Sequence, residues 1–220
     1  PPNTLICPVC TGQPGALPVV NPAAVELAAL AGLALGCRVN AVSAFARKNY
    51  FYPDLPKSYQ ITQRENPLCS DGAVEVDAPG GARRVRITRA HLEEDAGKSL
   101  YAGGRTLLDF NRCGAPLIEI VTAPDIGSAE EACAFLSELK LTLKWTGVCR
   151  CCMEDGELRC DVNVSLRRPG GAPGTRTEIK NLNSFKAVKD SINSETARQA
   201  ALVASGREVK SETLLWDAKA

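Results

Sequence analysis

The sequence lacks the features of several large classes of protein. Only one of its 220 residues is histidine, aromatic residues make up 5%, and the formal net charge is +1. A net charge this small argues against a strongly cationic nucleic-acid coat, although it allows a local basic patch. The apolar run after Glu26 is too short to cross a bilayer, so we expect no membrane segment.

Common nucleotide-binding loops are also missing. No glycine-rich loop ends in Gly-Lys-Ser/Thr, and no GxGxxG follows a strand, so any nucleotide site must use another framework. No signal peptide is visible, and the ten cysteines are spread through a chain long enough for its own core. These features favour a reducing compartment over a secreted disulfide framework. The chain begins at Pro1 without methionine and ends at Ala220, and we expect both ends to be cuts through a longer protein.

One CxxC pair, Cys7 and Cys10, lies near the N-terminus, and no second pair at suitable spacing follows. A structural zinc site needs four ligands, so the pair is at most half of one. Two buried thiols without a ligand are the second interpretation. A redox pair ranks third. Redox CxxC motifs normally open a helix after a strand, whereas the residues that follow Cys10 read as a loop.

Three helices are predicted from their end signals. Asn21 followed by proline begins a helix that runs to about Leu35, and its alanine and leucine coating predicts that it is largely buried. Ser128 begins a capping box for a core-facing helix that ends near Gly147. Ser184 caps a third helix, from Phe185 to about Ser205.

Alternating apolar residues predict hairpins elsewhere. One joins residues 73–77 to 83–88, residues 107–121 read as strand, turn and strand, and residues 157–167 pair with 175–181. Separate helices and hairpins together predict an α+β fold with a mainly antiparallel sheet.

The most conspicuous charged stretch is residues 87–98, where Glu93, Glu94 and Asp95 follow a strand. A solvated acidic loop is the commoner fate of such a run, and a divalent cation would be the functional reason for it. Continued strand geometry would point Glu93 and Glu94 to opposite faces. His91 lies beside them, and a lone histidine near acids is more often structural than catalytic.

Two further stretches contain candidate functional residues. Residues 47–63 combine tyrosines, prolines and cations in a rigid loop or edge segment, suited either to stacking on bases or to packing on the core. Glu119 lies inside an apolar run, and a buried carboxylate needs a metal, donors or a cation such as Arg112.

Six blocks of the sequence, taken together and in order, resemble one family. They are CPVCTGQPGALPVVN, ARKNYFYPDLPKSYQITQ, ITRAHLEEDAGKS, NRCGAPLIEIVTAPDI, GELRCDVNVSLR and TRTEIKNLNSF. They are similar to the B subunit of the tRNA-dependent amidotransferase, the GatB family, which converts Glu-tRNA(Gln) to Gln-tRNA(Gln) and Asp-tRNA(Asn) to Asn-tRNA(Asn). The resemblance implies that residues 1–220 are a partial catalytic cradle domain without its N-terminal strand and C-terminal domains.

The resemblance also implies a carbon–nitrogen ligase that uses glutamine as its nitrogen donor. ATP and Mg²⁺ activate the side-chain carboxylate as an acyl phosphate, and ammonia from the amidase, which is the A subunit, displaces the phosphate. The partners are this amidase, the small C subunit and the tRNA, with no membrane. The compartment is the bacterial cytoplasm, a mitochondrion or a plastid.

The resemblance assigns roles to residues of this chain. Glu93, Glu94 and Glu119 become candidate metal or channel carboxylates, with Glu94 and Glu119 as Mg²⁺ ligands, Glu94 favoured over Glu93, and Lys48 as the cation. Substrate or nucleotide contacts are assigned to Tyr50, Tyr52, Lys57, Tyr59, Asp161, Asn163, Glu178 and Lys180. Cys7 and Cys10 become half of a structural Zn²⁺ site whose other cysteine pair lies upstream.

Two alternatives stay open at this point. The chain is a non-catalytic tRNA-binding or assembly module of the same fold, or it is the archaeal paralogue that acts only on Glu-tRNA(Gln). The wording of the blocks fits the B subunit better.

Overall fold

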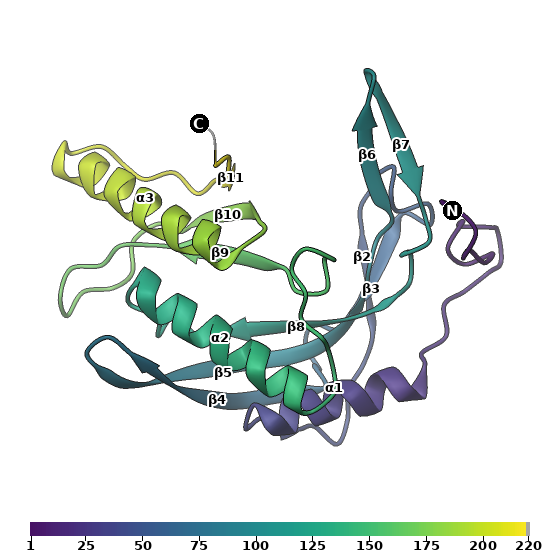
Figure 1. Ribbon diagram of the computed structural model, residues 1–220, viewed down its shortest axis with the longest axis horizontal. Coiled ribbons are helices and arrows are strands. Elements are labelled where there is room, and N and C mark those ends of the chain that lie inside the picture. Colours follow the sequence, from purple (N-terminus) through teal and green to yellow (C-terminus); the bar gives the residue numbers. More distant parts are fainter. Residues whose placement is uncertain (219–220) are drawn as a thin grey trace. The chain divides into compact units, whose positions relative to one another are not determined.

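The structure, a computed structural model, describes residues 1–218. The helices are α1 (Pro22–Ala34), α2 (Ala129–Trp145) and α3 (Phe185–Ala204). The strands are β1 (Arg38–Val39), β2 (Ala46–Asn49), β3 (Tyr59–Thr62), β4 (Cys69–Ala78), β5 (Gly81–Glu94), β6 (Lys98–Ala102), β7 (Arg105–Asp109), β8 (Pro116–Thr122), β9 (Cys160–Val164), β10 (Thr177–Leu182) and β11 (Thr213–Leu215) (Figure 1).

The chain forms two compact units. The first combines Pro1–Ala73 with Arg86–Ala123, and the second combines Val74–Val85 with Pro124–Ala220. Almost every strand pairing is antiparallel, and β10 with β11 is parallel. The α+β class with a mainly antiparallel sheet is therefore confirmed.

The first unit contains the strands on which the candidate functional residues of the acidic stretch and the tyrosine-rich stretch lie. Strand β5 pairs with β8 in the sheet order β1-β4-β5-β8, and β2 pairs with β3 in a separate hairpin. In the β5–β8 register, His91 lies opposite Glu119 and Glu93 lies opposite Leu117. Opposite residues and residues two apart on a strand point to the same face, so this register decides which acids meet.

The second unit packs α2 and α3 side by side, and α3 also packs on β9 and β10 (Figure 1). Helix α2 buries one stripe of apolar side chains, including Phe135, Leu139 and Leu143. Strands β9 and β10 form the predicted hairpin, with Asn163 opposite Glu178. Strand β9 is shorter than the alternation predicted.

The helix end signals are confirmed. The side chains of Asn21, Ser128 and Ser184 each accept a hydrogen bond from a main-chain N–H in the first turn of α1, α2 and α3. Gly36, just beyond α1, has a φ of 67°, the left-handed conformation that glycine adopts at little cost.

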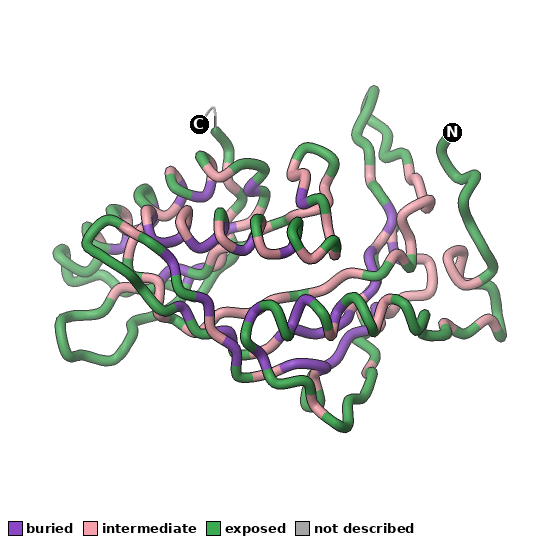
Figure 2. Tube along the Cα trace, turned by 60° about the horizontal axis from the view of Figure 1, so that its bottom comes forward, coloured by how far each residue is buried: buried purple, intermediate pink, exposed green. Residues whose placement is uncertain are grey.

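The prediction that α1 is largely buried is wrong. Its buried residues are Ala28, Ala31 and Gly32, whereas Leu27, Leu30 and Leu33 are 43%, 42% and 60% exposed (Figure 2). The buried side is the one on which Gly32 lies so close to Cys69 that a Cβ would be 2.3 Å from its Sγ. No helix within residues 1–218 is long and apolar enough to cross a membrane.

Candidate functional site

Three side chains of the first unit meet on one face of the β5–β8 pair. Strand β5 continues through the acidic run to Glu94, so His91 and Glu93 are two residues apart on one strand and share a face. Glu119 joins them because it lies opposite His91. Their potential ligand atoms all lie within 4.8 Å of one another, and no other such group of His, Cys, Asp or Glu side chains occurs among residues 1–218.

His91 lies between the two carboxylates. Its Nε2 is 3.6 Å from Glu93 Oε1 and 3.7 Å from Glu119 Oε2. The His91 and Glu93 side chains are 3% and 9% exposed, whereas that of Glu119 is 47% exposed. Solvent therefore reaches the cluster from the side of Glu119.

Strand β3 holds Glu93 from the other direction. Thr62 Oγ1 donates to Glu93 Oε1 at 2.6 Å, and Gln60 Nε2 donates to Glu93 Oε2 at 3.3 Å. Burial alone would raise the pKa of Glu93, but contacts with His91 and Thr62 and the charges of His91 and Lys48 lower it overall below its ordinary value. Glu93 is therefore ionised at neutral pH.

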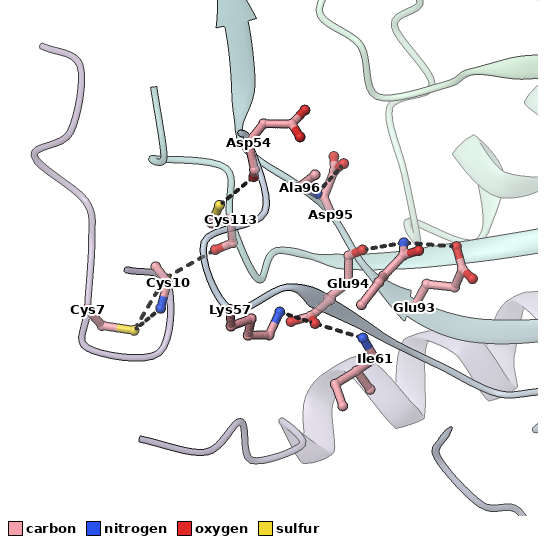
Figure 3. Close-up of polar contacts among 11 residues, drawn as sticks. Cys7, Cys10, Asp54, Lys57, Ile61, Glu93, Glu94, Asp95, Ala96 and Cys113 are labelled. Carbon is pink, nitrogen blue, oxygen red and sulfur yellow. Dashed lines mark hydrogen bonds and ion pairs between the residues drawn. The ribbon is translucent and has the colours of Figure 1, made fainter. Parts of the chain in front are cut away.

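Glu94 points away from Glu93 and makes a different set of contacts (Figure 3). Its Oε1 forms a buried ion pair with Lys57 Nζ and accepts a hydrogen bond from the Ile61 main-chain N–H at 2.7 Å. Both residues line a cavity of about 10 Å³ that Cys10 and Cys113 also line. That volume is near the minimum that one water molecule needs.

The expected pairing of Glu94 with Glu119 as joint Mg²⁺ ligands is therefore corrected. Residues Glu93 and Glu94 do point to opposite faces, as strand geometry predicts, but Glu93 is the one that meets Glu119. The preference for Glu94 failed because nothing in the local sequence indicates that Lys57 and the Ile61 N–H hold its carboxylate.

Two expectations about burial are also wrong. Glu93, Glu94 and Asp95 are not on a solvated loop, because β3 and the loop before it cover the end of β5; Glu94 is 7% exposed. Glu119 is not buried, because β8 ends the order of its sheet. Arg112 pairs with Asp95 at 3.2 Å instead of with Glu119.

Residues 47–63 form the β2–β3 hairpin and its connecting loop rather than a single loop. Lys48 lies opposite Gln60 in register, and its charge helps lower the pKa of Glu93. Its Nζ lies 5.6 Å from the centroid of the Tyr50 ring. The Tyr59 ring lies 4.9 Å from Lys57 Nζ and 5.0 Å from Arg47 Cζ. Cations and aromatic rings thus alternate around the β2–β3 hairpin.

Tyr50 and Tyr52 lie in the loop between β2 and β3. The Tyr50 and Tyr52 rings are 6.5 Å apart, and Tyr52 is 63% exposed. Burial and the nearby acids, Asp54 first among them, raise the pKa of Tyr50, so its phenol stays protonated. A protonated phenol is a hydrogen-bond donor, which suits a substrate contact.

The sheet residues predicted to line a cavity lie in the second unit. Lys180 Nζ is 3.1 Å from Asp161 Oδ2 and 3.5 Å from Glu178 Oε1, so the alternation argument placed these three side chains together correctly. Asn163 is exposed and lies opposite Glu178. Their role as cavity lining stays a prediction.

The CxxC pair forms a compact turn. The sulfur atoms of Cys7 and Cys10 are 3.2 Å apart, and the Cys10 N–H donates to Cys7 Sγ. The turn packs against the loop before β3, where a Cβ on Gly12 would be 2.8 Å from the Pro56 carbonyl. Within residues 1–218 no third metal ligand joins the pair, and its role in zinc binding stays a prediction.

The thiols around this turn should differ in reactivity. The Cys10 N–H and side chain lower the pKa of exposed Cys7, whereas burial raises the pKa of Cys113 to about 11. Because the thiolate is the reactive form, iodoacetamide should modify Cys7 well before Cys113 in chelator-treated native protein at pH 7.5. A mass-spectrometric time course checks this, and equal rates for the two thiols would contradict it.

Sequence reasoning missed three residues of the site. His91 was treated as structural, although its two-residue spacing from Glu93 in a strand that continues was a signal. Gln60 and Thr62 were not singled out, because nothing local shows which carboxylate a neighbouring strand will meet.

The donor set fits a divalent cation. Two carboxylates supply oxygen ligands of the kind that Mg²⁺ and Mn²⁺ prefer, and their combined charge matches that of the ion. His91 Nε2 is the ring nitrogen that faces the two acids, whereas Nδ1 is buried without a hydrogen-bond partner among residues 1–218. Imidazole is not a preferred Mg²⁺ ligand, so Glu93 and Glu119 are the residues that could hold such an ion.

Comparisons with known proteins show the family to which the chain belongs. The family described as the GatB/GatE catalytic domain matches residues 1–220. The chain belongs to this family. It is 56% identical over 218 residues to an aspartyl/glutamyl-tRNA(Asn/Gln) amidotransferase B subunit of Elusimicrobium minutum, and 54% identical over 219 residues to the B subunit of that name from Ruminiclostridium cellulolyticum.

Each of these matches covers 98% of the chain and 45% of the relative. The B subunit from Chlorobium chlorochromatii is 53% identical over 98% of the chain and 46% of its own length. The chain therefore spans under half the length of the curated relatives it matches.

Proposed function

We propose that this chain is the catalytic part of the B subunit of an Asp/Glu-tRNA(Asn/Gln) amidotransferase. The whole enzyme would be a ligase that converts Glu-tRNA(Gln) and Asp-tRNA(Asn) to Gln-tRNA(Gln) and Asn-tRNA(Asn). The observation that carries this proposal is the meeting of His91, Glu93 and Glu119 on one face of β5 and β8 in a member of the GatB/GatE family.

The proposed reaction has two steps. The side-chain carboxylate of the aminoacyl-tRNA attacks the γ-phosphorus of ATP, which yields an acyl phosphate and ADP. Ammonia then attacks the acyl carbon, phosphate leaves, and the amide forms after loss of a proton. In such a reaction the protein contributes mainly by positioning the reactants and by stabilising the charge around the transferring phosphoryl group.

The residues of the cluster suit the first step. Glu93 and Glu119 would hold Mg²⁺, which when bound offsets the negative charge of the phosphoryl group. His91 Nε2 lies between the two carboxylates. Lys48 adds a cation on the side of Glu93, where it can meet a phosphate oxygen.

The opposite face of β5 suits the second step. The Lys57–Glu94 ion pair lines a cavity with room for about one water, and ammonia is of the same size. We therefore propose Glu94 as a channel carboxylate rather than a metal ligand. The tyrosines Tyr50, Tyr52 and Tyr59 are proposed contacts to the aminoacyl end or the nucleotide.

Partners follow from the same proposal. The nitrogen would come from glutamine hydrolysed by an amidase, the A subunit, and the small C subunit would complete a heterotrimer. Structural Zn²⁺ at Cys7 and Cys10 is proposed only together with a further pair of ligands, because zinc sites of this kind have four.

The proposal predicts a requirement for ATP and a divalent cation in the complete complex. The full-length B subunit, assembled with its partners, should form Gln-tRNA(Gln) from Glu-tRNA(Gln) with glutamine, ATP and Mg²⁺. Omitting ATP or adding EDTA should reduce amide formation to background, and excess Mg²⁺ should restore it. Acid-gel separation of the labelled aminoacyl-adenosine products measures the conversion.

The same assay distinguishes the alternatives. A complex that binds tRNA but forms no amide under any condition would contradict the proposal and indicate a non-catalytic tRNA-binding module. Amidation of Glu-tRNA(Gln) but never of Asp-tRNA(Asn) would indicate the Glu-specific activity of the paralogue.

A further inference from the structure

Strand β3 contacts both acids at the end of β5. The Ile61 main-chain N–H donates to Glu94, while the side chains of Gln60 and Thr62, on either side of it, donate to Glu93. Gln60 Nε2 also donates to the Glu94 main-chain carbonyl at 2.8 Å. The side chains and the main chain of β3 therefore hold the carboxylates of Glu93 and Glu94, which lie on opposite faces of β5.

We propose that Thr62 and Gln60 are positioning residues that fix the Glu93 carboxylate for the metal ion. This inference rests on the proposed function, because it concerns the ion assigned there to Glu93 and Glu119. It assigns a task to two residues that contact neither the ion nor the substrate in the proposed site.

The contacts around Glu93 carry the argument. Each carboxylate oxygen of Glu93 accepts one hydrogen bond, Oε1 from Thr62 and Oε2 from Gln60, so the plane of the carboxylate is fixed. Each oxygen retains further lone-pair capacity, which a metal ion can use. Because the rotamer of Glu93 is already restricted, binding an ion costs less conformational entropy than it would for a mobile side chain.

The two donors are shielded from solvent. Thr62 and Gln60 are 4% and 8% exposed, and water has little access to them. A buried threonine on a strand needs no carboxylate partner, since its hydroxyl can donate to main-chain carbonyl oxygens. Thr62 instead donates to Glu93 Oε1 at 2.6 Å, a distance typical of hydrogen bonds from a hydroxyl to a carboxylate.

The expected size of the effect follows from other metal sites. Removing an outer-shell hydrogen-bond partner of a metal ligand lowers metal affinity by about 10- to 100-fold. Thr62→Val keeps the shape of the side chain and removes the hydroxyl, so we expect a loss in that range. Thr62→Ser keeps the hydroxyl and should stay within about threefold of the unaltered protein.

A control threonine is available in strand β10. Thr177 is fully buried, and its hydroxyl contacts the buried Gln199 and Glu195, two residues outside the His91–Glu93–Glu119 cluster. Thr177→Val therefore removes an equally buried hydroxyl beside a carboxylate. It should lower stability without changing metal affinity.

The test measures Mn²⁺ affinity of the full-length protein in its complex, by electron paramagnetic resonance titration of free Mn²⁺. Glu93→Gln, Thr62→Val, Thr62→Ser and Thr177→Val are compared at one pH. The inference expects weakened binding in the first two and unaltered binding in the last two. Gln60→Met, which removes the donor to Oε2, should weaken binding and decides the matter if Thr62→Val does not assemble.

The outcomes separate this inference from the proposed function. Weak binding in Glu93→Gln with unaltered binding in Thr62→Val and Gln60→Met would overturn the positioning role alone. Unaltered binding in Glu93→Gln would overturn the metal site and the positioning role together. An equal loss of affinity in Thr62→Val and Thr177→Val would show a general effect of lost stability and would also overturn the inference.

Discussion

Glu93→Gln in the full-length protein is expected to lower the rate of amide formation by about 100- to 1,000-fold, because it removes one of the two carboxylates proposed to hold the metal ion. The substitution keeps the size of the side chain, and its amide oxygen can still accept one of the two hydrogen bonds from Thr62 and Gln60, so the fold should survive. Glu119→Gln should lower the rate similarly. Initial rates with saturating ATP and Mg²⁺, measured by conversion of labelled Glu-tRNA(Gln), check the expectation.

Controls make this result specific. Glu75 is an exposed glutamate in the neighbouring strand β4, and Glu75→Gln should leave the rate unaltered. Binding of tRNA should stay close to that of the unaltered complex in every variant, because the acids are not proposed tRNA contacts. A Glu93→Gln complex that keeps full activity would remove Glu93 from the proposed mechanism.

Lys57→Met is expected to have the largest effect on stability, because it leaves the buried Glu94 carboxylate without its cation. Breaking a buried ion pair by removing one partner costs about 3–5 kcal/mol, since the remaining charge stays buried and uncompensated. The side chains of Lys57 and Glu94 are 10% and 9% exposed, so solvent screens the pair little. Chemical denaturation of the full-length protein measures the loss in the free energy of unfolding.

A double-mutant cycle isolates the pair. Adding Glu94→Gln to Lys57→Met should recover part of the loss, because the neutral amide still accepts the Ile61 N–H without burying a charge. The control is Lys186→Met, which breaks an exposed pair with Asp190 at 2.7 Å and should cost less than about 1 kcal/mol. Equal losses in Lys57→Met and Lys186→Met would contradict the account of a buried ion pair.

The helix ends and two of the hairpins, β4–β5 and β9–β10, could be predicted because their signals are local. Asn21, Ser128 and Ser184 cap helices through bonds to residues two or three positions away, and such spacing is visible in any sequence. Alternation likewise placed Asp161 and Lys180 on one face of a hairpin. The opposite orientations of Glu93 and Glu94 followed from the same rule.

The arrangement of the site could not be predicted, because it depends on contacts between residues far apart in the sequence. The β5–β8 register brings Glu119 to His91 from a distant part of the sequence, and β3 reaches Glu93 from an equally distant one. A one-residue change in the β5–β8 register would move every side chain of the shifted strand to the other face. Which of Glu93 and Glu94 meets Glu119 therefore required the tertiary structure, whereas the sequence alone favoured Glu94.

The exposed side of α1 shows the same limit. The all-round alanine and leucine coating predicted burial, yet Leu27, Leu30 and Leu33 are exposed within the part of the chain that the structure describes. Periodicity shows which residues can be buried together, and only packing shows which of them are.

The fate of the side-chain carboxylate oxygens tests the proposed acyl phosphate most directly. Glu-tRNA(Gln) carrying ¹⁸O in both side-chain carboxylate oxygens is converted by the complete complex with ATP, Mg²⁺ and glutamine. If the carboxylate attacks ATP to form an acyl phosphate, each amide formed should leave one ¹⁸O in the released phosphate, as mass spectrometry of that phosphate would show. Amide formation with unlabelled phosphate would contradict the account.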